Sequence, residues 1–313
     1  MTRSTATAGD LPHLITLRDL APAQILGLLD RAADLRQRFA AGTAPTALLD
    51  GRTVVNLFFE PSTRTRTSFE LAARRLGATV VNFDIASSST SKGETLEDTL
   101  ATLEAMGCDA FVVRHKENGT PARLARHARR AAILNAGDGN HAHPTQGLLD
   151  ALTIRDAKPR VGDLRVVICG DVRHSRVARS DAEVLAALGV RQIRLCGPAP
   201  LLPDPADFPG CALHDDFDEA IAGVDVVIML RLQKERMASA MIADERDYYA
   251  RYGLDPARLA RAAAGAIVLH PGPMNRGIEI ADEVADGAQS RILDQVANGV
   301  FVRMAALATL LDR

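Results

Sequence analysis

The sequence lacks tryptophan, has only 4% aromatic residues and contains no apolar run near the roughly 20 residues that a membrane span requires. Residues 1–10 have no apolar signal core, so we expect a loose polar tail and a cytoplasmic protein. The net charge of -2 gives no excess of positive charge for binding nucleic acid or an anionic membrane, and aromatic residues that could stack on bases are scarce. We therefore expect no nucleic-acid partner and no membrane association.

Cysteine is also scarce: the four residues lie far apart and form no CxxC pair. Three of them sit in or beside apolar runs, where a free cysteine behaves as a small hydrophobic side chain. The composition therefore predicts neither a metal site nor a disulfide framework, and we expect no cofactor.

Two nucleotide-binding patterns are missing. The sequence contains no GxxxxGK[ST], which excludes a nucleotide P-loop of that type. The segment CGDVRHSR, which follows a strand-like run at 164–170, does not match GxGxxG. A dinucleotide-dependent oxidoreductase, suggested only by the second set of strands, is therefore a remote alternative.

The segments that are present alternate between strand-like and helix-like patterns. An amphipathic helix is expected at 22–40, and Phe69, Ala72, Ala73 and Leu76 fall on one face of a second helix that Gly77 ends. Short apolar runs of the kind that form strands buried on both faces lie at 53–59, 79–84, 109–115, 131–137, 164–170, 191–197, 224–230 and 265–270. This alternation predicts an α/β protein with two domains, each a parallel sheet flanked by helices.

Polar residues gather where these strands end. Ligands of open α/β sheets bind at the carboxyl ends of the strands. Nearly every predicted strand is followed there by arginine, histidine or hydroxyl residues, in the segments 62–66, 87–92, 114–115, 141–146, 171–176, 231–236 and 270–276. The pattern indicates a site built for an anion.

The densest of these segments is FFEPSTRTRTSFE, residues 58–70, in which three hydroxyl residues and two arginines occupy five positions at a strand-to-helix turn. Free backbone N–H groups and the helix dipole favour a phosphate there, and Arg64 can bind two oxygens at once. The alternative is that Ser62 is an ordinary N-cap residue and the arginines only face solvent.

The chain resembles the aspartate and ornithine carbamoyltransferases. FFEPSTRTRTSFE is similar to their carbamoyl-phosphate motif, and further motifs match in order: SKGETLEDT (91–99), VVRH (112–115), LNAGDG with HPTQGLLD (134–150), RLQKER (231–236) and HPGPMNRGIEI (270–280). The resemblance runs from about residue 14 to the end. It implies a carbamoyl-phosphate-binding domain at 1–147, completed by a C-terminal helix at 298–313, an aspartate-binding domain at 148–297, and an active site in the cleft between them.

Among the members of this family, SKGETLEDT and RLQKER resemble the catalytic chain of the aspartate-using branch. HPGP at 270–273 has no cysteine nearby, whereas the ornithine-using branch usually carries a functional one there. Charge agrees, because a dicarboxylate needs cations and ornithine would be repelled by them. The implied reaction is that of carbamoyl phosphate with L-aspartate to N-carbamoyl-L-aspartate and phosphate, the first committed step of pyrimidine biosynthesis.

The resemblance also implies a role for each motif residue. Ser62, Thr63, Arg64, Thr65 and Arg114 would hold the phosphate. Arg64, Thr65 and His143 would polarise the carbonyl oxygen, and Gln146 with Gly272 and Pro273 would contact the carbamoyl amide. Pro271 and Pro273 can equally form a rigid turn with a cis bond. Arg176, Arg231 and Gln233 would bind the aspartate carboxylates, for which bidentate guanidinium geometry is suited.

Ser88 and Lys92 lie in a polar loop that alone reads as a flexible surface loop or lid. In the family this loop reaches the neighbouring subunit's site, so the resemblance implies a homotrimer with shared active sites, where Lys92 also acts in catalysis and aspartate binding. A regulatory or dihydroorotase-like partner chain is compatible with the family. The alternatives are a carbamoyltransferase for another amine such as ornithine, and a non-catalytic scaffold that kept the fold.

Overall fold

The computed structural model describes residues 11–83, 94–232 and 244–312. The predicted polar tail, the loop with Ser88 and Lys92, and Gln233 therefore lie outside the described residues. The chain divides into two compact units, Met1–Leu149 with Ala297–Arg313, and Asp150–Val296. The boundary falls inside two long helices, α5 (Pro144–Ala157) and α11 (Ile292–Leu311).

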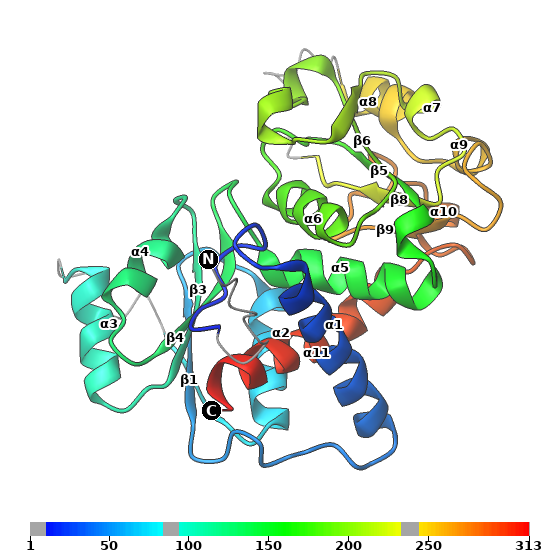
Figure 1. Cartoon of the computed structure of the whole chain (residues 1–313). Coiled ribbons are helices and arrows are strands. Elements are labelled where there is room, and N and C mark those ends of the chain that lie inside the picture. The colour runs from blue at the N-terminus through cyan, green and yellow to red at the C-terminus, as the bar shows by residue number, and fades with distance from the viewer. Residues whose placement is uncertain (1–10, 84–93, 233–243, 313) are drawn as a thin grey trace, which may run out of the picture. The chain divides into compact units, whose positions relative to one another are not determined.

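The first unit contains a parallel sheet of four strands in the order β2-β1-β3-β4. The strands are β1 (Thr53–Phe58), β2 (Thr79–Asn82), β3 (Ala110–His115) and β4 (Ala132–Asp138). The helices α3 (Leu96–Ala105) and α4 (Thr120–His127) cover one face, where Leu100 and Leu124 pack against Phe111. In Figure 1, α1 (Pro22–Ala40), α2 (Thr63–Arg75) and α11 lie on the other side of this sheet.

The second unit contains a parallel sheet of five strands in the order β7-β6-β5-β8-β9. The strands are β5 (Arg165–Cys169), β6 (Gln192–Cys196), β7 (Cys211–His214), β8 (Val226–Met229) and β9 (Ile267–Leu269). Its further helices are α6 (Arg176–Ala187), α7 (Phe217–Ala220), α8 (Glu245–Tyr252), α9 (Pro256–Leu259) and α10 (Asp282–Ala285), with short 3-10 turns at Val161–Asp163, Ala199–Leu201 and Pro205–Asp207.

The predicted α/β class is confirmed, and every predicted strand is present with its ends shifted by at most two residues, residue 84 lying outside the described part. The expected core face of α2 is also confirmed, since Phe69, Ala72, Ala73 and Leu76 are fully buried. The strand β7 was not predicted. It is a four-residue edge strand of which three residues are partly buried and one is exposed, so it lacks the continuous buried apolar run that marks a central parallel strand.

The helices of the described ranges include none that is both long and apolar enough to cross a membrane.

Candidate active site

The sheet of the first unit has a switch point between β1 and β3. From β1 the chain moves outward to β2, and from β3 it moves outward the other way to β4. At such a point the two connections leave a crevice beyond the carboxyl ends of the strands. Ser62 to Thr65 follow β1, and Arg114 lies in β3 in register with Phe58 of β1. The structure thus brings these predicted phosphate-binding residues to one crevice.

The turn after β1 leads directly into α2, whose N-cap residue is Ser62. Its backbone is extended, with φ -160° and ψ 98°, and its side chain makes no capping hydrogen bond. Ser62 therefore occupies the N-cap position, as the alternative requires, but its hydroxyl does not cap the helix. The first-turn N–H groups of this 13-residue helix leave an electropositive end at the switch point.

Arg114 is held from both sides of its strand. Its guanidinium donates to the carbonyl oxygen of Ala136 on β4 at 3.1 Å and pairs with the carboxylate of Glu60, which follows β1. The residue is only 8% exposed, so these contacts fix its direction. We did not predict Glu60, although it stands two residues before Ser62 in the motif, because an acidic residue does not fit a search for anion donors.

The turn after β4 is organised by the buried carboxylate of Asp138. This carboxylate accepts hydrogen bonds from the side chain of Asn135 at 2.8 Å and from the backbone N–H groups of Gly119 and Ala142 at 2.7 and 3.1 Å. It also lies 3.0 Å from Nδ1 of His141. Asp138 was not predicted either; the signal was the acidic residue in LNAGDG directly after a strand.

The predicted residues His143 and Gln146 follow this turn. His143 precedes Pro144, the first residue of α5, and the N–H of Gln146 donates to the His143 carbonyl oxygen at 2.9 Å. Both residues are buried, at 4% and 8% exposed. Because β4 lies beside β3, His143 and Gln146 stand at the same carboxyl ends of the strands as Arg114.

His115 lies next to Arg114 but has a structural role. Its Nδ1 accepts from the backbone N–H of Glu117 at 3.0 Å and lies 3.1 Å from Oγ1 of Thr120, the first residue of α4. Burial lowers the pKa of His115 and favours the neutral ring that these contacts need.

The second unit repeats this arrangement with its switch point between β5 and β8. Arg176 is the first residue of α6, which follows β5, and Arg231 comes two residues after β8. The strands are joined at their ends by the Leu230 N–H, which donates to the Cys169 carbonyl oxygen at 2.7 Å. The helix start is fixed by Ser175, whose hydroxyl accepts from the Ala178 N–H at 3.1 Å. Two arginines of the second unit therefore stand at its switch point.

Gly272 and Pro273 lie in the turn after β9, the strand beside β8. The Gly272–Pro273 peptide bond is cis, as the alternative of a proline turn allows, and Gly272 has φ +65°, a conformation that favours glycine. The N–H of Gly272 donates to Nδ1 of His270 at 2.8 Å. The remaining predicted residues, Ser88, Lys92 and Gln233, lie outside the described residues.

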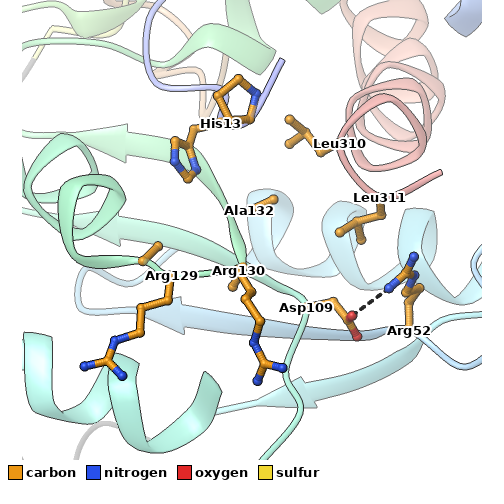
Figure 2. A pocket seen from close by; sticks show the side chains of 11 residues that line it. His13, Arg52, Asp109, Arg129, Arg130, Ala132, Leu310 and Leu311 are labelled. Atoms are coloured by element: carbon orange, nitrogen blue, oxygen red, sulfur yellow. Dashed lines mark hydrogen bonds and ion pairs between the residues drawn. The ribbon is translucent and has the colours of Figure 1, made fainter. Parts of the chain in front are cut away.

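A surface hollow of the first unit lies at the amino ends of its strands. Figure 2 shows Arg52 and Asp109, which precede β1 and β3 and are joined by an ion pair of 3.0 Å, together with Arg129 and Arg130, which precede β4. The predicted site residues of this unit that the structure describes lie at the carboxyl ends of the strands instead. The hollow is therefore separate from the candidate active site.

Comparison with known proteins agrees with this geometry. The model of the aspartate/ornithine carbamoyltransferase carbamoyl-P binding domain matches residues 12–156, and that of the Asp/Orn binding domain matches residues 162–310. The aspartate carbamoyltransferase catalytic subunit of Xanthomonas campestris is 58% identical over 305 residues, 97% of each chain.

Solved structures match over almost the whole chain as well. Aspartate transcarbamoylase from Trypanosoma cruzi in complex with N-(phosphonacetyl)-L-aspartic acid has a TM-score of 0.89 and 32% identity, and covers 98% of each chain. The same enzyme in complex with carbamoyl phosphate and aspartate has a TM-score of 0.86, 32% identity, and coverage of 98% of this chain and 100% of that chain. Ornithine carbamoyltransferase from Pyrococcus furiosus has a TM-score of 0.86 with 26% identity and covers 96% of each chain.

Proposed function

Because the chain belongs to the aspartate/ornithine carbamoyltransferase family, we propose that it transfers the carbamoyl group of carbamoyl phosphate to L-aspartate. The products are N-carbamoyl-L-aspartate and phosphate, in the first committed step of pyrimidine biosynthesis. The observation that carries this function is the presence of two arginines at the switch point of each unit, in a chain 58% identical to an aspartate carbamoyltransferase catalytic subunit over nearly its whole length.

The phosphate would be held by the first turn of α2 and by Arg114. The helix end offers free N–H groups, Ser62 offers a hydroxyl not used in capping, and Arg64 can bind two oxygens. Thr63 and Thr65 add hydroxyl donors. The pairing of Arg114 with Glu60 supports this role because it aims a guanidinium before any ligand arrives.

The chemical step begins when the aspartate amine attacks the carbonyl carbon of carbamoyl phosphate. The new C–N bond gives a tetrahedral intermediate whose oxygen carries negative charge, and the C–O bond to phosphate then breaks. Arg64, Thr65 and His143 are proposed to donate to that oxygen, and Gln146 to hold the carbamoyl NH₂. We propose that the departing phosphate takes the proton that the amine loses.

The aspartate carboxylates are assigned to Arg176, Arg231 and Gln233. The two arginines follow adjacent strands of one sheet, Arg176 at the start of α6 and Arg231 after β8, which supports binding of a dicarboxylate rather than of a cationic amine. Gly272 and Pro273, in the turn after β9, are proposed to contact the carbamoyl group. The location of the active site in a cleft between the two domains stays a prediction.

We further propose a homotrimer in the cytoplasm in which Ser88 and Lys92 complete the site of a neighbouring subunit. The test is complementation: Lys92→Ala and Arg64→Ala chains, each inactive alone, are mixed and reassembled. Shared sites require that some activity returns, because one hybrid site in each mixed trimer is intact. Verified mixed trimers without activity would contradict the shared site.

The reaction itself is tested by phosphate release from carbamoyl phosphate with L-aspartate or L-ornithine as acceptor. We expect turnover with aspartate only. Turnover with ornithine only would keep the phosphate half of the proposal and overturn the roles of Arg176 and Arg231. The fold alone does not decide this, since the Pyrococcus furiosus ornithine enzyme matches with a TM-score of 0.86. Turnover with neither acceptor would favour a non-catalytic scaffold.

A further inference from the structure

A chain of buried hydrogen bonds lies behind the turn after β9. The side chain of Gln295 on α11 donates to Asp150 on α5 at 2.5 Å, and its oxygen accepts from the backbone N–H of His270 at 2.9 Å. The His270 ring then accepts from the Gly272 N–H at 2.8 Å. Asp150, His270 and Gln295 are at most 2% exposed, so water does not compete for these bonds.

The contacts of His270 fix the tautomer of its ring. Nδ1 faces an N–H donor, so it must carry a lone pair, and the ring proton must sit on Nε2. Nε2 lies 3.3 Å from Oε1 of Glu279, whose side chain is also fully buried. The two nitrogens therefore have different tasks: Nε2 fixes the ring, and Nδ1 holds the turn.

The far end of the same turn is held by the same Glu279 carboxylate and by the strand end at Leu232. Oε1 of Glu279 also accepts from the backbone N–H of Asn275 at 2.5 Å, and the Asn275 side chain donates to the Leu232 carbonyl oxygen at 3.2 Å. Leu232 directly follows Arg231. The turn at 271–275 is thus attached at one end to His270 and at the other to the strand end that carries an aspartate-binding arginine.

We propose that His270 is a positioning residue for carbamoyl phosphate. Its Nδ1, by accepting the Gly272 N–H, fixes the turn so that Gly272 and Pro273 meet the carbamoyl group. This inference rests on the proposed function, since it assumes that the turn contacts that group. His270 itself touches no substrate, and its effect passes through the backbone of the turn.

Two substitutions separate the tasks of the ring nitrogens. In His270→Asn the amide oxygen takes the place of Nδ1 and can still accept the Gly272 N–H, whereas the contact with Glu279 is lost. In His270→Gln the amide nitrogen takes the place of Nε2, and the acceptor for Gly272 is lost. His214→Gln is the matched control, because His214 lies in β7, at the opposite edge of the sheet from β9.

The kinetic test compares KM for carbamoyl phosphate with the inhibition constant of inorganic phosphate, which has no carbamoyl group to meet the turn. In His270→Gln we expect KM to rise about tenfold, the effect of one lost hydrogen bond of ordinary strength, while the phosphate constant stays within about twofold. His270→Asn should change KM by less than about threefold. Equal damage in both variants, or a parallel rise of both constants, would overturn the proposal.

Asn275→Ala removes the side-chain contact at the other end of the same turn. Because Asn275 is only half-buried, this variant keeps the proposal testable if His270→Gln does not fold. It should show the same separation, a raised KM for carbamoyl phosphate with an unchanged phosphate constant. An unchanged KM in a folded Asn275→Ala chain would contradict the proposal that the order of this turn affects the binding of carbamoyl phosphate.

Amide hydrogen exchange of Gly272, Met274 and Asn275, the residues of the turn that carry a backbone N–H, gives a readout that needs no turnover. Exchange should rise in His270→Gln and stay low in His270→Asn. If the wild-type chain fails to turn over, the proposed function fails, and exchange still decides whether His270 orders the turn. If the wild type is active and exchange rises without any change in KM, the function stands and the positioning role is wrong.

Discussion

Asp181 provides a stability prediction that is independent of activity. Its side chain on α6 is fully buried, and its carboxylate meets no N–H donor among the described residues but lies beside the carboxylate of Asp150. Burial, and next the neighbouring carboxylate of Asp150, raise the pKa of Asp181 well above its usual range. The folded pair therefore holds a proton that the unfolded chain releases.

The sign of the pH dependence follows from that proton. Because the folded pKa of Asp181 is raised, its contribution to stability is complete below the unfolded pKa, near 4, and falls as pH rises toward the folded pKa. In that window one proton is bound on folding, so the free energy of unfolding falls by about 1.36 kcal/mol per pH unit. For a domain of the size of Asp150–Val296, this slope corresponds to a fall in Tm of roughly 3 °C for each pH unit.

Asp181→Asn removes this cost, since an amide can donate to Asp150 without taking up a proton. Thermal melts of the wild type and the variant are recorded from pH 5 to pH 8. We expect the Tm of Asp181→Asn to exceed that of the wild type by a margin that grows with pH, while the other titrating groups cancel in the difference. The control is Asp163→Asn, at a carboxylate that is 70% exposed, which should show no such trend.

The reasoning would be refuted by a difference in Tm between wild type and Asp181→Asn that stays constant from pH 5 to pH 8. A variant that is less stable at every pH would also refute it, because the carboxyl pair would then contribute packing or bonding that an amide cannot replace.

Three further predictions concern the described residues. The carboxylate of Glu104 accepts the backbone N–H groups of 129–131 at 2.8 to 3.2 Å, so Glu104→Ala should lower the free energy of unfolding by about 3 kcal/mol in denaturant melts. Burial raises the pKa of Cys211 to about 11, so alkylation of the folded protein at this thiol should be slow at pH 8 and quicken as pH approaches 11, as peptide mass spectrometry would detect. Gly77 and Gly107 have φ near +90°, but an added Cβ would lie 2.7 Å from a backbone oxygen only at Gly77; Gly77→Ala should therefore destabilise more than Gly107→Ala, and equal Tm losses would contradict this.

Local sequence patterns were sufficient to predict most of the strands and the helix start that follows β1. Periodicity of two or 3.6 residues depends only on neighbours along the chain, which is why the strands and the buried face of α2 could be predicted. Edge strand β7 escaped because half-buried strands lack the apolar run used to find the others. Ser62 to Thr65 could be predicted as phosphate-binding residues because a helix start after a strand is itself a local feature.

The partners of the site residues were decided only by the tertiary structure. Glu60 and Arg114 are 54 residues apart in the chain and meet because β1 and β3 are adjacent in the sheet. Asp150 and Gln295 are 145 residues apart and meet where two helices pack. Strand order is set by which apolar faces bury one another, and no local pattern encodes it. Local sequence therefore suffices to propose which groups bind an anion, whereas only the fold brings Glu60 to Arg114 and Gln295 to Asp150.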